Sequence, residues 1–363
     1  MMGNIHDQKN HDRGSVCGSN QGPKCLASDA GDSARGFGVG QIPKALRAGA
    51  GVDGGGYITV RAAGLAELSP ERMRAGNGGS SSASSVHREK VGTGTQKYGI
   101  LNMKFKMKTL VNAIQKGGQG KTFATCHLAF DGAARGLRVV VIDLDPQGNA
   151  SFTLQAYACG LSSSQLFTGD ESLVSSIFKD RDNSGISLIR KDDLLANVEK
   201  MNVEDAAKAL RTQVENLSKH FDICLIDTPP FISNLMVSAL FASDFVMSPF
   251  EPEPYSIQGM QKMVSVIQNV RSRGNPDLKF IGMLPNRVDA RNARQLENLA
   301  AIRAAKGFQG LVMPFDCRQR GSIGEALGDQ IPVWQIKKTA ARVAAKEVRV
   351  MTQYVFEKME VVQ

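Results

Sequence analysis

A glycine-rich loop stands between a strand-like run and a helical run of the sequence. The apolar residues 109–114 lead into Gln-Lys-Gly-Gly-Gln-Gly-Lys-Thr at 115–122, and an alanine-rich helical pattern follows as far as Gly136. In this context, glycines let backbone N–H groups close around phosphate oxygens, and the helix N-terminus adds its positive dipole end. The loop therefore predicts an α/β fold that binds phosphate.

Strand and helix patterns alternate from about Met107 to the end of the chain, as they do in a parallel α/β sheet. Short apolar runs predict buried strands at residues 109–114, 139–143, 221–227, 245–250, 280–284 and 311–315. We therefore predict one α/β domain of the P-loop NTPase class over residues 107–363, with a mainly parallel, twisted sheet flanked by helices.

Residues 1–106 differ in composition from the rest of the chain. They contain roughly 20 of its 37 glycines, and too few apolar residues remain to offset the entropy of ordering. We predict a largely disordered extension there. Because Met107 opens directly on the first predicted strand, we also expect translation from Met103 or Met107 to give a short, active form, which an intact-mass measurement on protein from the natural host would test.

The composition narrows the class of partner and the cellular setting. Lys and Arg outnumber Asp and Glu by 44 to 35, and the resulting pI near 9.3 favours a polyanion such as nucleic acid. The six cysteines show neither a C-x-x-C pair nor zinc-site spacing, which indicates a reduced cytoplasmic setting. No apolar run reaches the ~18 residues of a membrane span, and the N-terminus lacks a signal-peptide pattern.

Individual residues of the loop have distinct expected roles. Lys121 reaches the β- and γ-phosphates, and Thr122 ligates Mg²⁺. A second lysine, Lys116, follows Gln115, which stands where the usual pattern has a glycine. The residues expected to bind the nucleotide are Gly117, Gly118, Gln119, Gly120, Lys121, Thr122 and Phe123.

Carboxylates follow two of the predicted strands. Asp143 and Asp145 begin the segment Asp-Leu-Asp-Pro-Gln-Gly-Asn, and period-two geometry points both side chains toward the phosphate loop. Asp227 ends another apolar run and precedes Thr-Pro-Pro. Asp143 and Asp145 could merely end a strand and begin a turn, but the register of all three segments favours a shared site.

These segments together resemble the ParA/MinD family of ATPases over residues 108–359. The loop resembles the family's deviant Walker A box, K-G-G-x-G-K-[ST], and the aspartate segments resemble its D-x-D-P-Q-[GA]-N and Walker B motifs. By this resemblance, Lys116 crosses a dimer interface to the nucleotide of the other subunit, and Asp145 orients the attacking water. The implied catalytic residues are Lys116, Lys121 and Asp145. The implied metal ligands are Thr122, Asp143 and Asp227.

The resemblance also implies a base contact after the strand at 280–284. The family places an asparagine against the adenine ring, and Asn286 occupies the matching position. Its alternative role is to cap a helix predicted at residues 290–305. Both interpretations stay open at this point.

A final helix is predicted at residues 335–357. Its apolar side is expected to comprise Ile336, Ala340, Val343, Ala344, Met351 and Val355. At 100° per residue, four basic residues fall within about 80° of one another on the opposite side. Such a stripe can follow a DNA backbone, although an ordinary solvated face is the alternative. The candidate DNA-binding residues are Lys338, Arg342, Lys346 and Arg349.

The resemblance implies ATP and Mg²⁺ as cofactors and a plasmid partition mechanism. The protein would form a homodimer on ATP, bind DNA non-specifically at the nucleoid, and respond to a centromere-bound ParB-type partner of the KorB kind. Intrinsic hydrolysis should be slow, because a free carboxylate near pKa ~3.9 positions water better than it deprotonates it. Nothing in residues 1–106 supplies the operator-binding winged helix of larger partition ATPases, so autoregulation is not expected.

Three other functions are weighed against partition. A MinD-like membrane-surface positioning ATPase shares the loop but ends in a basic amphipathic segment, whereas the tail at 357–363 is short and contains acidic residues. An enzyme coupling ATP to small-molecule or electron-transfer chemistry would need a substrate pocket or cluster cysteines, and Cys159 and Cys224 lack such spacing. A scaffold without turnover is disfavoured by the complete set Lys121, Thr122, Asp145 and Asp227.

Overall fold

The structure is a computed structural model that describes residues 106–361. Apart from Lys106, the predicted extension lies outside the described residues, as do Met103 and the last two residues of the chain. The predictions of disorder, of an internal start and of a domain boundary at residue 107 therefore stay predictions.

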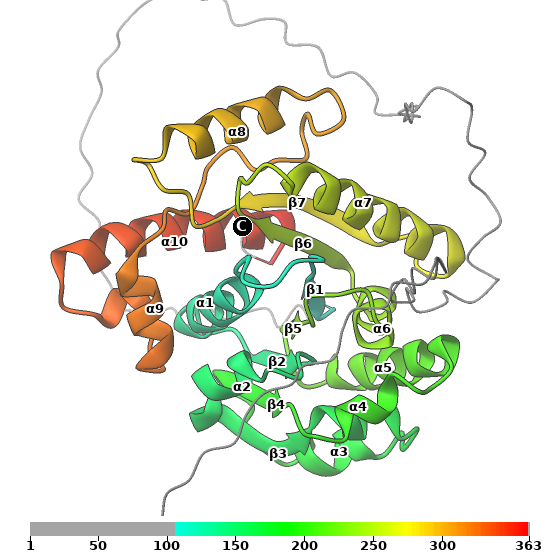
Figure 1. The fold of residues 1–363 in the computed structure, drawn as a ribbon. Helices are drawn as coiled ribbons and strands as arrows, with labels where there is room; N and C mark the ends of the chain where they lie inside the picture. The colour runs from blue at the N-terminus through cyan, green and yellow to red at the C-terminus, as the bar shows by residue number, and fades with distance from the viewer. Residues whose placement is uncertain (1–105, 362–363) are drawn as a thin grey trace, which may run out of the picture. The chain divides into compact units, whose positions relative to one another are not determined.

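Within residues 106–361 the structure contains a single seven-stranded sheet in the order β3-β4-β2-β5-β1-β6-β7 (Figure 1). Every neighbouring pair is parallel, which confirms the predicted α/β fold with a parallel sheet. The strands are β1 (Lys108–Asn112), β2 (Val139–Asp143), β3 (Ala158–Ser162), β4 (Ile186–Arg190), β5 (Ile223–Asp227), β6 (Phe245–Phe250) and β7 (Lys279–Pro285).

Helices cover both faces of the sheet, so the central strands are buried on both sides. Alternate residues of β1 serve opposite faces: Leu110 packs in one hydrophobic cluster and Val111 in the other. The Leu110 face carries α1 (Lys121–Ala134), α2 (Asn149–Thr153), α9 (Gly321–Gly328) and α10 (Thr339–Lys358).

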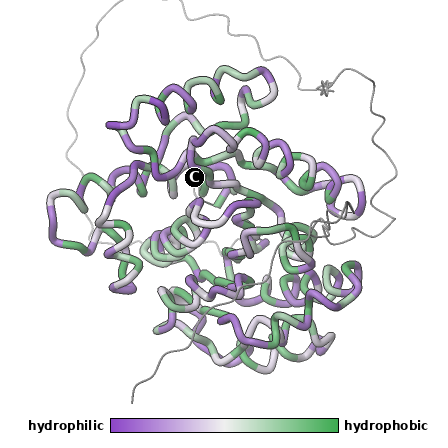
Figure 2. The backbone as a smooth tube through the Cα atoms, in the orientation of Figure 1, coloured by the Kyte–Doolittle hydropathy of each residue, from purple (hydrophilic) through white to green (hydrophobic). Residues whose placement is uncertain are grey.

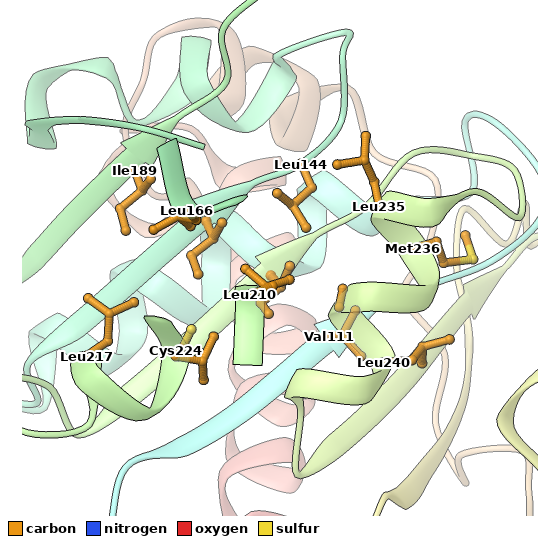
Figure 3. Packing of buried hydrophobic residues seen from close by; sticks show 14 of the residues in the cluster. Val111, Leu144, Leu166, Ile189, Leu210, Leu217, Cys224, Leu235, Met236 and Leu240 are labelled. Atoms are coloured by element: carbon orange, nitrogen blue, oxygen red, sulfur yellow. The ribbon is translucent and has the colours of Figure 1, made fainter. Parts of the chain in front are cut away.

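The Val111 face carries most of the remaining helices (Figure 1). Figure 3 shows Leu210 and Met236 from two of them gathered with Val111 and with Cys224 of β5. Hydrophobic and hydrophilic residues alternate along the helices (Figure 2) because only one side of each is buried. These helices are α3 (Leu173–Phe178), α4 (Leu195–Val198), α5 (Val203–Leu217), α6 (Asn234–Ala242) and α7 (Ser256–Arg273), and α8 (Ala293–Ala304) packs with α7 around a third cluster.

The prediction of a strand at residues 311–315 is wrong. Val312 forms only an isolated parallel bridge with Met283 of β7, where Met283 N–H donates to the Leu311 carbonyl at 2.7 Å. Pro314 lacks an N–H group and stops the pairing from continuing. Instead, the sheet gains β3 and β4, which the sequence analysis did not identify.

The last helix begins later than predicted. Val333–Gln335 form a 3-10 turn, and Lys338 is extended, so α10 starts at Thr339. The buried side of α10 also differs from the predicted one, because Ala340 and Val343 are exposed. The side that packs into the core comprises Ala341, Ala344, Val348, Met351 and Val355.

Candidate functional site

The carboxyl ends of β1, β2, β5 and β7 meet at one edge of the sheet, around a cavity of about 600 Å³. In the register of the parallel pairs, Asn112 and Asp143 both lie opposite Asp227. The phosphate loop follows β1 and lines the same cavity. Residues from distant parts of the sequence are thus brought together as predicted.

Backbone geometry requires glycine in the phosphate loop. Gly118 and Gly120 have φ values of 74° and 100°, in the left-handed region. A Cβ at Gly120 would lie 2.0 Å from Nδ2 of Asn286, so no side chain fits there. Lys121 follows at the start of α1, where burial lowers the pKa of its ammonium while Asp227 and Asp145 oppose that shift.

Two buried carboxylates lie opposite each other at the ends of β2 and β5. Thr122 Oγ1 donates to Asp227 Oδ2 at 2.6 Å, and Asp143 Oδ2 accepts from the backbone N–H and the Oγ of Ser151 at 2.7 and 2.6 Å. Burial raises the pKa of both carboxyls. The negative charge of Asp143 raises the pKa of Asp227 further, and that of Asp145 raises the pKa of Asp143, against hydrogen bonds from Ser151. A divalent cation would relieve this repulsion.

The oxygen donors fit magnesium, which prefers hard ligands and is commonly held by one or two carboxylates together with nucleotide phosphates. Between residues 106 and 361, no group of three His, Cys, Asp or Glu side chains could hold a metal by itself. Thr122, Asp143 and Asp227 therefore suit an ion that is bound jointly with phosphate oxygens.

Asp145 borders the cavity beside the loop. It is 5% exposed, and its Oδ1 accepts from the Gln147 N–H at 3.0 Å. Burial raises the pKa of this carboxyl, while the Gln147 N–H and Lys121 oppose the shift. The carboxylate can hold a water molecule at the edge of the phosphate site.

Asn286, after β7, supports the phosphate loop. Its Nδ2 donates to the Gln119 carbonyl at 2.8 Å, and the side chain is 3% exposed. The alternative of a helix cap is wrong, because Asn292 caps α8 by accepting from the Gln295 N–H. Asn286 instead lines the cavity beside the phosphate loop.

The second lysine of the loop is accessible. The Lys116 side chain is 49% exposed and forms an ion pair with Glu253, which follows β6. Arg287 donates from Nη1 to the Gly118 carbonyl at 3.1 Å and pairs with Glu251 at 3.0 Å. The sequence did not identify Glu251, Glu253 or Arg287 as site residues, although each comes after a predicted strand at the same edge of the sheet.

The four candidate DNA-binding residues do not form one stripe. Lys338 precedes α10 and pairs with Glu325 at 2.6 Å. Arg349 pairs with the buried Asp131 of α1, and its guanidinium lies 3.9 Å from the centre of the Trp334 ring. Of the four, Arg342 and Lys346 lie on α10 with exposed side chains.

Comparisons with known proteins agree with this architecture. A family model described as an AAA domain matches residues 107–280. The chain is 49% identical to Protein IncC from Escherichia coli over 100% of both chains. It is 32% identical to the chromosome-partitioning ATPase Soj from Thermus thermophilus, over 63% of this chain and 91% of Soj. The fold matches that of McdA from Cyanothece in its ATP complex, with a TM-score of 0.58 at 22% identity over 69% and 96% of the two chains.

Proposed function

Because this chain belongs to the ParA-type partition ATPases, we propose that it binds Mg²⁺–ATP in the cavity, dimerises on the nucleotide and uses hydrolysis to move plasmid DNA. Within the family, the Met107 start, the glycine-rich extension and the late motifs predict an IncC protein of the IncP plasmids. The similarity to Protein IncC over the full length of both chains supports that prediction. The observation that carries the proposal is the convergence of the phosphate loop and Asp145 on one cavity, with the paired carboxylates Asp143 and Asp227 buried behind Thr122.

Nucleotide binding is expected to use the N-terminus of α1. Backbone N–H groups of Gly117–Gly120 surround the phosphates, and Lys121 contacts the β- and γ-phosphates. Thr122, Asp143 and Asp227 would hold the magnesium ion, which supplies neutralisation of phosphate charge. Asp145 positions the water molecule that attacks the γ-phosphate, so its role is orientation more than proton abstraction.

Dimerisation is expected to involve Lys116. Its side chain is exposed beside the phosphate loop, and its partner Glu253 is itself 42% exposed, so the ion pair can separate at little cost. In the proposed dimer, each Lys116 contacts the triphosphate held by the second subunit. DNA would then be held by Arg342 and Lys346, doubled by the dimer, with weak and salt-sensitive affinity.

A membrane-surface role has less support. The apolar side of α10 packs into the core, and Met359 behind it is fully buried. None of the helices described between residues 106 and 361 has the length and apolarity needed to cross a bilayer. Flotation with anionic liposomes would favour that alternative if the protein rose with the vesicles.

Retention on DNA in the presence of ATP tests the proposed function. Lys121→Ala should abolish retention, because the contact with the β- and γ-phosphates is lost. Asp145→Ala should prolong retention, because binding persists while hydrolysis stops. ATPase activity should rise when DNA and a ParB-type centromere-binding protein of the KorB kind are added. If both variants behave like the parent, the mechanism is wrong.

A further inference from the structure

Asn112 is a fully buried asparagine at the carboxyl end of β1. In the register of the sheet, it lies between Asp227 of β5 and the apolar Met247 of β6. Its Nδ2 donates to Thr125 Oγ1 of α1 at 2.9 Å, whereas its Oδ1 accepts no hydrogen bond from any residue between 106 and 361. One polar atom of Asn112 is therefore buried without a partner, next to a carboxylate that is proposed to hold the magnesium ion.

Packing does not account for an asparagine at position 112. A buried acceptor without a hydrogen-bond partner destabilises a folded protein. The neighbours on the same face of the sheet, Leu110 of β1 and Met247 of β6, pack in the hydrophobic cluster that includes α1. A leucine at position 112 could join that cluster and would leave no polar atom unpaired. The contact of Asn112 with Thr125 is thus the feature for which a role is needed.

Thr125 connects Asn112 to the phosphate site. Its Oγ1 lies 3.1 Å from the Lys121 carbonyl and 3.4 Å from Asp227 Oδ1. Because this oxygen accepts from the Asn112 amide, its own proton is left for these two acceptors. From inside the protein, Thr125 therefore contacts the lysine that is proposed to bind the β- and γ-phosphates and a proposed metal ligand.

Threonine hydroxyls contact both carboxylate oxygens of Asp227. Thr122 Oγ1 donates to Oδ2 at 2.6 Å, and Thr125 Oγ1 approaches Oδ1. The chain just after Asp227 is also fixed to β1, because Thr228 Oγ1 donates to the Asn112 carbonyl at 2.7 Å. Thr122 is expected to bind the ion itself, whereas Thr125 is fully buried beneath it. Thr125 is thus the hydroxyl that can orient Asp227 without binding the ion.

We infer that Asn112 and Thr125 are positioning residues for magnesium. The Asn112 amide fixes the Thr125 hydroxyl, which holds the Asp227 carboxylate in the orientation that receives the ion. Neither Asn112 nor Thr125 touches the ion or the nucleotide. This role rests on the proposed binding of Mg²⁺–ATP, and it names the residues behind the site that set its affinity for the metal.

Nucleotide binding with and without magnesium tests the positioning role. Magnesium is titrated into protein that holds a fluorescent, non-hydrolysable ATP analogue. In Asn112→Leu and in Thr125→Val, which keeps the shape of the side chain, the affinity for magnesium should fall roughly 10- to 100-fold. Binding of the analogue in excess EDTA should stay at the parent value, because the phosphate contacts are unchanged. The double variant should lose no more than the larger single loss, because both substitutions interrupt the same chain of hydrogen bonds.

Asn183→Leu is the matched control. Asn183 is also a buried asparagine, its Nδ2 donates to the Phe178 carbonyl at 3.1 Å, and its Oδ1 has no partner among the described residues. It precedes β4, however, and so lies at the opposite edge of the sheet from the phosphate site. The magnesium affinity of Asn183→Leu should therefore equal that of the parent.

Thermal unfolding without nucleotide separates positioning from folding. Asn112→Leu should melt at or above the temperature of the parent, because the unpaired acceptor is gone, and Thr125→Val keeps the role testable if the leucine folds poorly. Unchanged magnesium affinity in both variants would overturn the role alone. So would an equal loss of analogue binding in magnesium and in EDTA, or a comparable loss of magnesium affinity in Asn183→Leu. A parent protein that does not bind Mg²⁺–ATP would refute the proposed function, and the positioning role with it.

Discussion

Both the backbone conformation and a neighbouring side chain require glycine at position 120. Its φ of 100° is left-handed, and a Cβ there would collide with Asn286. We expect Gly120→Ala to destabilise the fold by roughly 2–4 kcal/mol and to abolish ATP binding. Gly136→Ala is the matched control, because φ is 81° but no atom lies within 4 Å, so roughly 1 kcal/mol should be lost. Urea unfolding measures both; equal losses would contradict the steric role of Asn286.

His127 links α1 to the segment before α10. Its Nδ1 lies 3.0 Å from the Phe123 carbonyl, and its Nε2 accepts from the Val333 N–H at 3.4 Å, which fits one neutral tautomer. Burial lowers the pKa of this imidazole to about 4, from an ordinary value of 6.5. The unfolded chain therefore takes up the proton first as the pH falls.

His127 makes the folded protein less stable as the pH falls from 6.5 to 4. Above pH 6.5 the residue is neutral in both states, and between pH 6.5 and 4 protonation favours the unfolded chain. From pH 7.5 to pH 5, the parent should lose about 2 kcal/mol more free energy of unfolding than His127→Gln, which does not titrate. Denaturant unfolding at the two pH values checks this, and parallel curves would show that His127 is not buried in its neutral form.

The sequence predicted the residues of the site better than their contacts. The identities of Lys121, Thr122, Asp143 and Asp227 follow from motifs whose spacing is local. The pairing of Lys116 with Glu253 joins residues 137 positions apart, and no periodicity encodes that distance. Contacts between residues far apart in the sequence depend on the order of the strands in the sheet. The contacts of Arg287 with Gly118 and Glu251 were not predicted for the same reason.

Arg349 links α10 to α1 through an ion pair with Asp131. Its partner Asp131 is fully buried and also pairs with Arg135 at 2.9 Å. Removing Arg349 leaves Asp131 with one cation instead of two, so Arg349→Ala should cost roughly 1–3 kcal/mol, below the value for a fully buried pair because the Arg349 side chain is 41% exposed. Thermal or denaturant unfolding measures this loss.

Lys346 is the comparison on the same helix, because it is exposed and projects away from the core. Lys346→Glu should change stability by no more than about 0.5 kcal/mol but weaken ATP-dependent DNA retention. Arg349→Ala should retain DNA normally below its melting temperature. If Arg349→Ala weakened DNA retention and Lys346→Glu did not, Arg349 and not Lys346 would contact the DNA.

The elements differ in how far sequence alone determined them. β2 and β6 match their predicted bounds because each is a mostly apolar run that is buried along its whole length. β3 (Ala-Cys-Gly-Leu-Ser) is an edge strand with an irregular register, and only Cys159 and Leu161 are buried in it, so it carries little pattern. The start of α10 was misplaced because Ile336 fits the apolar periodicity of the helix, whereas Ile336 and Lys338 both have extended backbone in the structure.

At the scale of the whole molecule, the proposed mechanism requires two copies of the chain. Lys116 pairs with Glu253 of its own chain and lies at the mouth of the phosphate site, where a second subunit's triphosphate could replace that carboxylate. A more strongly charged partner favours the exchange, because charge-assisted contacts to phosphate are stronger than an exposed ion pair. Dimer formation should therefore depend on both the nucleotide and Lys116.

Light scattering on protein saturated with a non-hydrolysable ATP analogue measures this dependence. The parent should show about twice the chain mass of 39.1 kDa, whereas Lys116→Ala should remain at 39.1 kDa with its nucleotide bound. Lys262→Ala removes another exposed lysine, on α7, and should dimerise like the parent. If Lys116→Ala also dimerises, the lysine does not bridge the subunits. If the saturated parent stays monomeric, the nucleotide does not join them, and the partition mechanism proposed for this fold loses its central step.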